Sequence, residues 1–200
     1  MDSFVDVAFP LKGRDLPIDH GYPLFGAVSR LVPRLHQERT WGIHPVYGRR
    51  EEPGRLRLLS TSLLTMRVPT GSIGELLVLS GQTLDVAGAR VAVGIPRVFP
   101  MRPRPMLRSR LVTIKKFTED GTDFTGAVRR QLNAMEVSDS AAIKVGARRV
   151  VRVSTHVIVG FPVELCGLTE DESVRVQTVG IGGRRHMGAG LFLAPEPEAA

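Results

Sequence analysis

The feature that constrains the fold most is an order of strand and helix patterns that occurs twice along this 200-residue chain. In each half, one strand-like segment is followed by a helix-like segment, two strand-like segments, a second helix and a last strand. This β-α-β-β-α-β order is that of the ferredoxin-like fold. We therefore expect an α+β protein with two tandem ferredoxin-like (RRM-like) domains. The halves share no residue-level repeat, so one larger α+β domain is the alternative.

The boundary between the domains is expected at a stretch rich in proline and arginine, "MRPRPMLRSR". Such composition is typical of a linker. The sequence thus predicts an N-terminal domain over residues 1–100, a linker over 101–109 and a C-terminal domain over 110–200.

In the first half, residues 19–38 have the apolar spacing of a helix, with Pro23 near its first turn. Pro33 must kink this helix or split it in two. A second, shorter helix is expected over 70–81. Strands are expected over residues 3–11, 54–69 and 82–100, the last with a hairpin turn near Gly88.

In the second half, helices are expected over residues 121–137 and 169–180. The latter begins with the capping box Thr169–Glu172 and ends at Gly180. Strands are expected over residues 109–117, 141–168 (as a pair) and 191–195.

The charge balance favours a nucleic-acid partner. The formal net charge is +7, and only four of the 27 basic residues are lysines. Arginine grips phosphate with a planar fork, and a basic domain of this kind commonly binds nucleic acid. A GC-rich genome would explain the arginine excess but not the net charge. Aromatic residues make up only 6%, which argues against binding mainly by base stacking.

Several classes of protein are disfavoured by the sequence. The apolar runs are too short to span a bilayer, and the basic start of a signal peptide is missing, so we expect a cytoplasmic protein. Cys166 is the single cysteine, which excludes a disulfide framework and a cysteine-based zinc site within one chain. No His, Asp or Glu cluster has metal-ligand spacing, and we expect neither a metal nor a cofactor.

The C-terminal segment "GIGGRRHMGAG", residues 180–190, concentrates glycine and positive charge. A dinucleotide fingerprint would follow a strand and open a helix, whereas this segment follows a helix, and the Gly-Lys-Ser/Thr end of a P-loop is missing. Glycines can turn successive backbone N–H groups outward to form an anion-binding concavity. We therefore expect a loop that holds an RNA backbone. A glycine-rich tight turn is the alternative.

The form of this segment, Gly180-Ile181-Gly182 and then Gly188-Ala189-Gly190, resembles the C-terminal signature of the CRISPR repeat-processing endoribonucleases of the RAMP superfamily. The segment "DHGYPLFGAVSRLVPRLHQ" is similar to the first helix of that family. "LVTIKKF" and "GIGGRRHMGAGLF" resemble the compact variant of myxobacterial-type type I systems. The resemblance implies tandem ferredoxin-like domains and metal-independent cleavage of CRISPR precursor RNA within its repeats, by 2′-OH attack, leaving 2′,3′-cyclic phosphate and 5′-OH ends.

The resemblance also implies partners and an RNA-binding surface. The partners are CRISPR repeat RNA (pre-crRNA and crRNA) and the subunits of a type I effector complex (Cascade). The residues expected to bind RNA are Arg108, Arg110, Lys115, Lys116, Gly180, Gly182, Arg184, Arg185, His186, Gly188 and Gly190.

Histidine titrates near neutrality and suits proton transfer to and from RNA. The resemblance places the general acid/base at His36, at the end of the first helix, with Tyr22 at its start. His20 is the alternative base, His44 a less favoured loop residue, and His156 more typical of a structural strand residue. The lysine usual in such sites is missing after His36, so Lys115, Lys116 or an arginine would have to replace it.

Two other functions fit the sequence. One is a non-catalytic RNA-binding subunit of a CRISPR effector complex with the same fold. The other is an unrelated basic α+β protein, such as a ribosomal or RNA-modification factor. A non-catalytic effector subunit would bind repeat RNA tightly without cutting it, whereas an endoribonuclease would cut it. An unrelated basic protein would show no preference for repeat RNA.

Overall fold

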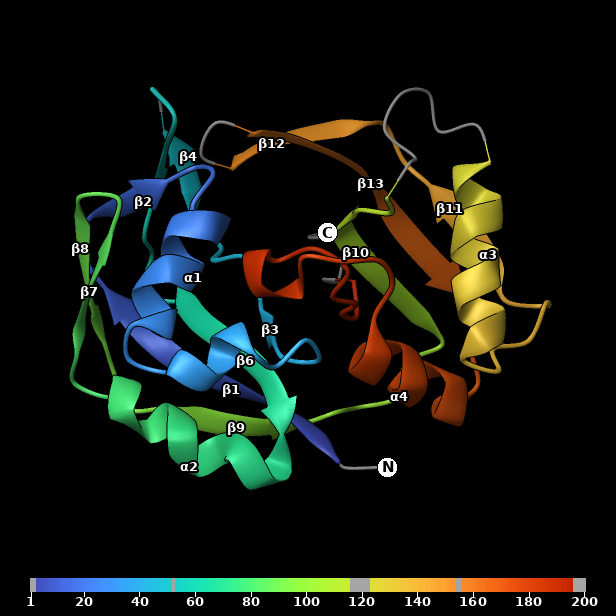
Figure 1. Ribbon diagram of the computed structural model, residues 1–200, viewed down its shortest axis with the longest axis horizontal. Helices are drawn as coiled ribbons and strands as arrows, with labels where there is room; N and C mark the ends of the chain where they lie inside the picture. Colours follow the sequence, from blue (N-terminus) through green and yellow to red (C-terminus); the bar gives the residue numbers. More distant parts are fainter. Residues whose placement is uncertain (1–2, 52, 116–122, 154–155, 196–200) are drawn as a thin grey trace. The chain divides into compact units, whose positions relative to one another are not determined.

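The computed structural model describes residues 3–51, 53–115, 123–153 and 156–195 (Figure 1). The chain forms two compact units. The first contains Met1–Pro100 together with Arg185–Gly188, and the second contains Met101–Arg184 and Ala189–Ala200. A short piece of the C-terminal glycine-rich segment thus belongs to the N-terminal unit.

The first unit is built on an antiparallel sheet centred on β1 (Phe4–Lys12). On one edge, β1 pairs with β6 (Leu63–Pro69), which in turn pairs with β3 (Gly42–Ile43). On the other edge, β1 pairs with β9 (Arg97–Pro100) over Val5–Ala8. The order β3-β6-β1-β9, with helical segments after β1 and after β6, is that of a ferredoxin-like domain.

Further strands are added to this sheet in the first unit. The hairpin β7 (Thr83–Val86) and β8 (Ala89–Val93) joins β1 at Leu11 and Lys12, and its turn places Ala87 and Gly88 at positive φ. A small separate sheet has the order β2-β5-β4, from Asp15–Pro17, Arg55–Arg57 and Arg49–Glu51. The strand expected over 54–69 is therefore two strands, β5 and β6.

The helical segments of the first unit are shorter than expected. Pro33 does split the predicted first helix, into α1 (Gly21–Ser29) and the 3-10 helix η1 (Pro33–His36). The second predicted helix is a chain of three short pieces, η2 (Thr70–Ser72), α2 (Ile73–Leu76) and η3 (Leu77–Leu79). Both segments contribute leucines to the hydrophobic core of this unit, which also contains the fully buried Trp41.

The second unit repeats the same arrangement. Its strands are β10 (Met106–Val112), β11 (Ala142–Val145), β12 (Arg149–Val153) and β13 (His156–Cys166), and its helices are α3 (Phe124–Ala134) and α4 (Glu170–Val179). The sheet order is β10-β13-β11, with β12 also paired to β13, and a bridge between Arg108 and Leu193 adds the C-terminal segment beside β10. This is again the ferredoxin-like order, so the tandem fold is confirmed.

Local signals in the second unit are accurate, whereas some boundaries are not. The capping box of Thr169 and Glu172 is present, and Gly180 ends α4. Residues 106–109, which we assigned to the linker, instead open β10 because they pair with β13. The last predicted strand is reduced to the single bridge at Leu193. Within the described residues, no helix is long and apolar enough to cross a membrane.

Candidate functional site

The helical segment α1–η1 presents the candidate catalytic residues of the first unit. Leu24, Val28 and Leu35 are buried in the core and fix one side of the segment. His36 is the last residue of η1 and is exposed. Its imidazole therefore stands at the surface on an anchored support, as the sequence predicts.

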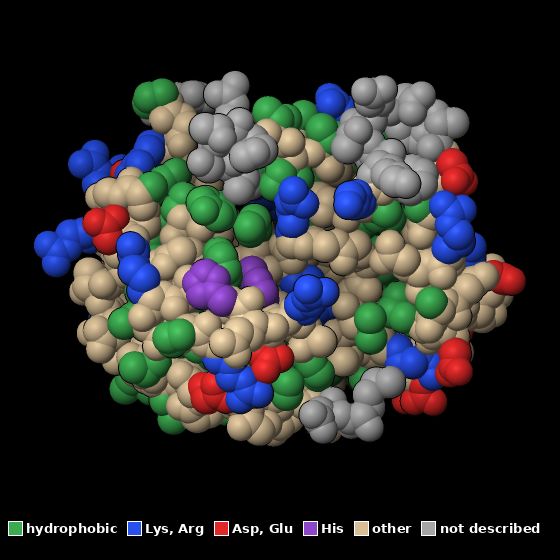
Figure 2. Space-filling model, viewed as in Figure 1, with side chains coloured by type: hydrophobic (Ala, Val, Ile, Leu, Met, Phe, Trp, Pro, Cys, Tyr) green, Lys and Arg blue, Asp and Glu red, His purple; other side chains and the backbone are tan. Residues whose placement is uncertain are grey.

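Phe25 of α1 connects two histidines that are far apart in the sequence. Its ring contacts His36 edge-to-face, with centroids 5.0 Å apart, and stacks on His186 with centroids 5.2 Å apart and planes within 5°. Figure 2 shows histidine side chains (purple) reaching the molecular surface. The two imidazoles thus share one aromatic support.

His186 is held by a second contact. Its Nε2 lies 2.6 Å from the carbonyl oxygen of Glu38, which can only accept a hydrogen bond. Burial lowers the pKa of His186, and the charges of Arg185 and His36 act in the same direction, while the bond to Glu38 opposes them. The imidazole is therefore neutral near pH 7, with its proton on Nε2.

His186 reaches this position because the 3-10 helix η4 (Arg185–Met187) packs on α1 and β3. A Cβ at Gly21 would lie 2.6 Å from the carbonyl oxygen of Met187, so only glycine permits this close approach. Gly188 has φ +81°, and a Cβ there would lie 2.8 Å from Cγ of Pro45. These two glycines let Arg185–Gly188 pack directly on the rest of the first unit.

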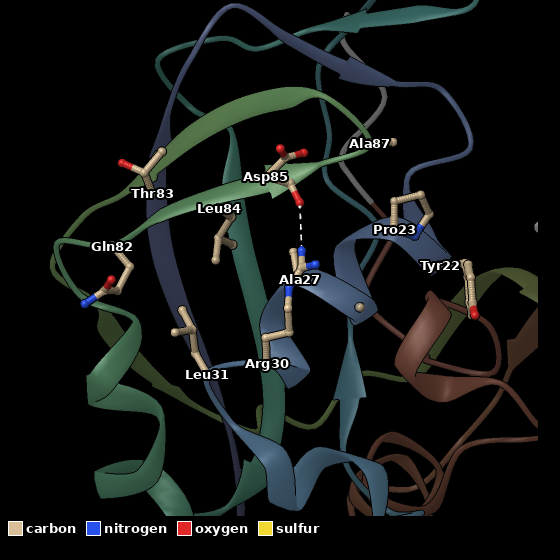
Figure 3. A pocket seen from close by; sticks show the side chains of 11 residues that line it. Tyr22, Pro23, Ala27, Arg30, Leu31, Gln82, Thr83, Leu84, Asp85 and Ala87 are labelled. Carbon is tan, nitrogen blue, oxygen red and sulfur yellow. Dashed lines mark hydrogen bonds between the residues drawn. The ribbon is translucent and has the colours of Figure 1, made fainter.

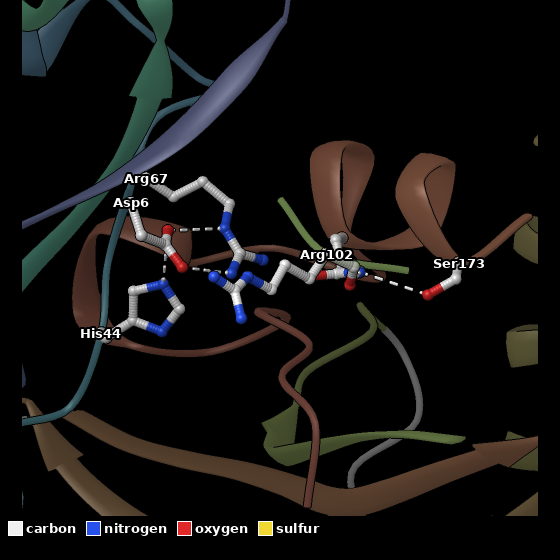
Figure 4. A network of polar contacts seen from close by, with 6 residues as sticks. Asp6, His44, Arg67, Arg102 and Ser173 are labelled. Carbon is white, nitrogen blue, oxygen red and sulfur yellow. Dashed lines mark hydrogen bonds and ion pairs between the residues drawn. The ribbon is translucent and has the colours of Figure 1, made fainter. Parts of the chain in front are cut away.

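A buried polar cluster lies beneath this segment in the first unit (Figure 4). Asp6 accepts two hydrogen bonds from the fully buried Arg67, at 2.9 and 2.8 Å, and lies 3.3 Å from Nε2 of His44. Burial alone would raise the pKa of the Asp6 carboxyl, but the bonds from His44 and Arg67 hold it well below its usual range. Arg185 is also buried, and burial together with the charge of Arg67 lowers its pKa to about 10.

Three of the residues singled out from the sequence are buried. Arg185, which we expected to bind RNA, is only 6% exposed. His44 is buried in the cluster, and desolvation lowers its pKa. His20, the alternative base, is 3% exposed; its Nε2 accepts from the N–H of Val46 at 2.9 Å, and its Nδ1 lies 3.0 Å from the carbonyl oxygen of Pro17. Both ring nitrogens of His20 thus serve the fold.

The glycine-rich segment does not present the open row of N–H groups that we expected. Ile181 donates to Gly190, Gly182 to Oε1 of Gln131, Gly183 to Thr113, and Gly190 to Leu111. The N–H groups of Gly180, Gly188 and Ala189 donate to Val176, Arg185 and Arg184. Gly188 and Gly190 are buried as well. The glycines therefore mainly allow the chain to turn tightly, which was the alternative interpretation.

The second unit nonetheless offers a basic surface beside this segment. A pocket of about 630 Å³ is lined by Lys115, Gly182, Gly183 and Arg184 together with residues of β13. Lys115 and Arg184 are exposed. Arg108 and Arg110 alternate along β10 with the buried Leu107 and Ser109; Arg108 is exposed and Arg110 is half-buried.

A second pocket lies along the other side of α1 (Figure 3). Its volume is 650 Å³, and it is lined by Tyr22, Arg30 and Leu31 and by Gln82–Asp85 of the β7 region. Arg30 donates to the carbonyl oxygen of Asp85 at 3.3 Å across it. Tyr22 is 43% exposed at its rim, so the tyrosine singled out from the sequence is available to a ligand.

Two residues of the site escaped the sequence analysis. Phe25 read as one more apolar residue of an amphipathic helix, and Glu38 contributes only its backbone carbonyl, for which the sequence holds no signal. Lys116 lies outside the described residues, as does the side chain of His156. Over the ranges that the structure covers, no group of three or more His, Cys, Asp or Glu residues is arranged to hold a metal ion.

Comparison with known proteins agrees with this architecture. A family model described as Cas6 Crispr matches residues 5–196. A CRISPR-associated endonuclease Cas6 of Myxococcus xanthus (strain DK1622) is 41% identical over 192 residues, which are 96% of this chain and 82% of that protein.

Solved structures share the fold at low identity. A CRISPR associated protein Cas6 superposes with a TM-score of 0.66 at 12% identity and covers 98% of this chain and 100% of its own. A RAMP protein that binds different RNA substrates gives a TM-score of 0.64 at 12% identity and covers 97% of this chain and 100% of its own. With the family match spanning nearly its whole length, this chain belongs to the Cas6 family of CRISPR-associated endonucleases.

Proposed function

We propose that this protein cuts CRISPR precursor RNA within its repeats to release guide RNAs. The observation that carries the proposal is the exposed His36 at the end of η1, on a first unit whose fold belongs to the Cas6 family. The substrate is then the repeat of the precursor RNA, and the product is the guide RNA. The protein partners are subunits of a type I effector complex.

The proposed reaction is an internal transesterification. The 2′-oxygen attacks the adjacent phosphorus, the bond from phosphorus to the 5′-oxygen breaks, and the products carry a 2′,3′-cyclic phosphate and a 5′-OH. The nucleophile is part of the RNA, so the protein has to remove one proton, supply one proton and stabilise the charged intermediate. Imidazole groups perform such proton transfers without a metal ion.

The basic residues of the second unit support this function. This unit carries Lys115, Arg184, Arg108 and Arg110, and arginine binds phosphate through paired hydrogen bonds. Tyr22 is exposed at the rim of the pocket beside α1, and we propose that it contacts the substrate as well.

The test is cleavage of end-labelled repeat RNA by the purified protein in excess EDTA. We expect a single cut within the repeat, and no cut when the nucleotide before the scissile phosphate is 2′-deoxy. Cleavage of the deoxy substrate at the same bond would contradict the mechanism. Tight binding of repeat RNA without cleavage would identify a non-catalytic RNA-binding subunit instead.

A further inference from the structure

We propose that His186 is a second catalytic histidine, which accepts the proton of the attacking 2′-OH, while His36 donates a proton to the 5′ leaving oxygen. This inference rests on the proposed ribonuclease function and divides its proton transfers between two residues. It begins from the shared contact of both imidazoles with the ring of Phe25. It changes the role expected for His186 from RNA binding to catalysis.

The orientation of His186 is fixed by two independent contacts. Stacking on Phe25, with the ring planes within 5°, sets the plane of the imidazole. The 2.6 Å contact from Nε2 to the carbonyl oxygen of Glu38 sets its rotation within that plane. Because the carbonyl requires a hydrogen on Nε2, proton exchange with a substrate is left to Nδ1.

The environment of His186 keeps Nδ1 in its basic form. The charged groups that face it are Arg185 of its own segment and His36 of η1, and both disfavour a second proton on the ring, as burial does. The carbonyl of Glu38 acts in the opposite direction but is outweighed. A neutral imidazole near pH 7 with one available lone pair is the form that a general base requires.

His36 differs from His186 in its exposure to solvent, which matters for a general acid. It is exposed at the end of η1, and its edge-to-face contact with Phe25 restricts the ring without burying it. An exposed imidazole can exchange protons with solvent between turnovers. The phenyl ring of Phe25 contacts both imidazoles, so it holds them on one surface as two separate groups.

The two roles balance the reaction. Nδ1 of His186 takes the proton from the 2′-OH as the bond from the 2′-oxygen to phosphorus forms. A ring nitrogen of His36 gives its proton to the 5′-oxygen as the bond from phosphorus to that oxygen breaks. Attacking and leaving oxygens lie roughly in line in such a displacement, which suits two groups better than one.

The decisive experiment compares His36→Gln and His186→Gln in single-turnover cleavage of two repeat RNAs. One has the normal 5′-oxygen at the scissile phosphate, and the other has sulfur in that position. A thiolate needs no proton to leave, because its pKa is about 8.5. On the oxygen substrate, we expect both variants to be slower by roughly 10²–10⁴. Sulfur should restore His36→Gln to near the wild-type rate and should leave His186→Gln slow.

Several results would overturn the assignment. If His186→Gln cleaves the oxygen substrate at a rate within about threefold of the wild-type rate, His186 has no catalytic role. Rescue of His186→Gln by sulfur, in place of His36→Gln, would contradict the division of roles. If wild-type protein cuts no repeat RNA, the proposed function itself fails, which is distinguishable because no variant is needed to see it.

Two measurements separate a catalytic defect from a folding defect. The thermal midpoint and the repeat-RNA affinity of His186→Gln should stay close to those of the wild type, because glutamine can still donate to Glu38. In the wild-type pH–rate profile, the midpoint of the acid limb should lie below the ordinary pKa of histidine. This limb should be missing in His186→Gln. Gln37→Ala, at an exposed neighbour of His36, should cleave like the wild type and serves as the control.

Discussion

Arg184 and Arg185 are consecutive residues with opposite environments. Arg184 is exposed, has φ +64°, and lines the pocket of the second unit with Lys115. Arg185 is 6% exposed and lies in the buried cluster of the first unit with Asp6 and Arg67. Their charges therefore cannot play the same part in binding RNA.

The first prediction follows from this difference. Arg184→Ala should weaken repeat-RNA binding and reduce the slope of log K against log salt by about one, because one phosphate contact is lost. Arg185→Ala should leave that slope unchanged, since its side chain is buried. Binding isotherms at three or more salt concentrations test both variants, and equal loss of slope in the two would contradict the assignment.

A second prediction concerns the reason for glycine at position 190. Gly190 has φ +70°, and an added Cβ would lie 2.3 Å from the carbonyl oxygen of Ile181. Gly190→Ala should therefore lower the free energy of unfolding by more than about 1 kcal/mol. At Gly183 an added Cβ meets nothing within 4 Å, so Gly183→Ala should change stability by at most about 0.5 kcal/mol. Urea titration distinguishes the two, and equal stability would refute a structural role for Gly190.

Features that depend on residues close together in the sequence were predicted correctly for this chain. The capping box at Thr169, the stop at Gly180 and the break at Pro33 depend on residues a few positions apart, and all three were predicted. The two ferredoxin-like domains were predicted too, because their strand and helix patterns follow in a characteristic order.

Contacts between distant residues could not be anticipated in the same way. The hydrogen bond from His186 to Glu38 joins positions 148 residues apart, and the N–H groups of the glycine segment find partners at Leu111, Thr113 and Gln131. The same limitation explains why the burial of His20 and of Arg185 was not predicted, because it depends on contacts with residues distant in the sequence.

The third prediction tests the buried ion pair of the first unit. Asp6→Asn should lower the free energy of unfolding by about 3 kcal/mol or more, because the fully buried Arg67 loses the carboxylate that accepts its two hydrogen bonds. Asp139→Asn is the matched control, since its carboxylate is exposed in a 3.8 Å ion pair with Arg129 and contributes little. Denaturant titration of both variants measures the difference. A small effect of Asp6→Asn would show that the pair is dispensable.

The fourth prediction concerns pH and His44. Burial lowers the pKa of His44, so the unfolded chain takes up a proton near the ordinary histidine value while the folded protein does not. The stability from this group is therefore complete above that value and is lost as pH falls through the interval down to the lowered pKa. The free energy of unfolding should decrease between about pH 7 and 5, and His44→Gln should flatten the decrease. An unchanged slope in His44→Gln would assign the pH dependence to other groups.

The last prediction separates the two parts of Tyr22. Its ring stands 43% exposed at the rim of the pocket along α1, where it can stack on a base, and its hydroxyl can hydrogen-bond the sugar or a transferring proton. If the hydroxyl supports the chemistry, Tyr22→Phe should bind repeat RNA normally and cleave it roughly tenfold more slowly, as expected for one lost hydrogen bond of about 1.4 kcal/mol. Tyr22→Ala should additionally weaken binding, because a stacked base contributes about 1–3 kcal/mol. Single-turnover rates and equilibrium affinities for both variants separate these contributions. Normal cleavage by Tyr22→Phe would leave Tyr22 a role in stacking alone.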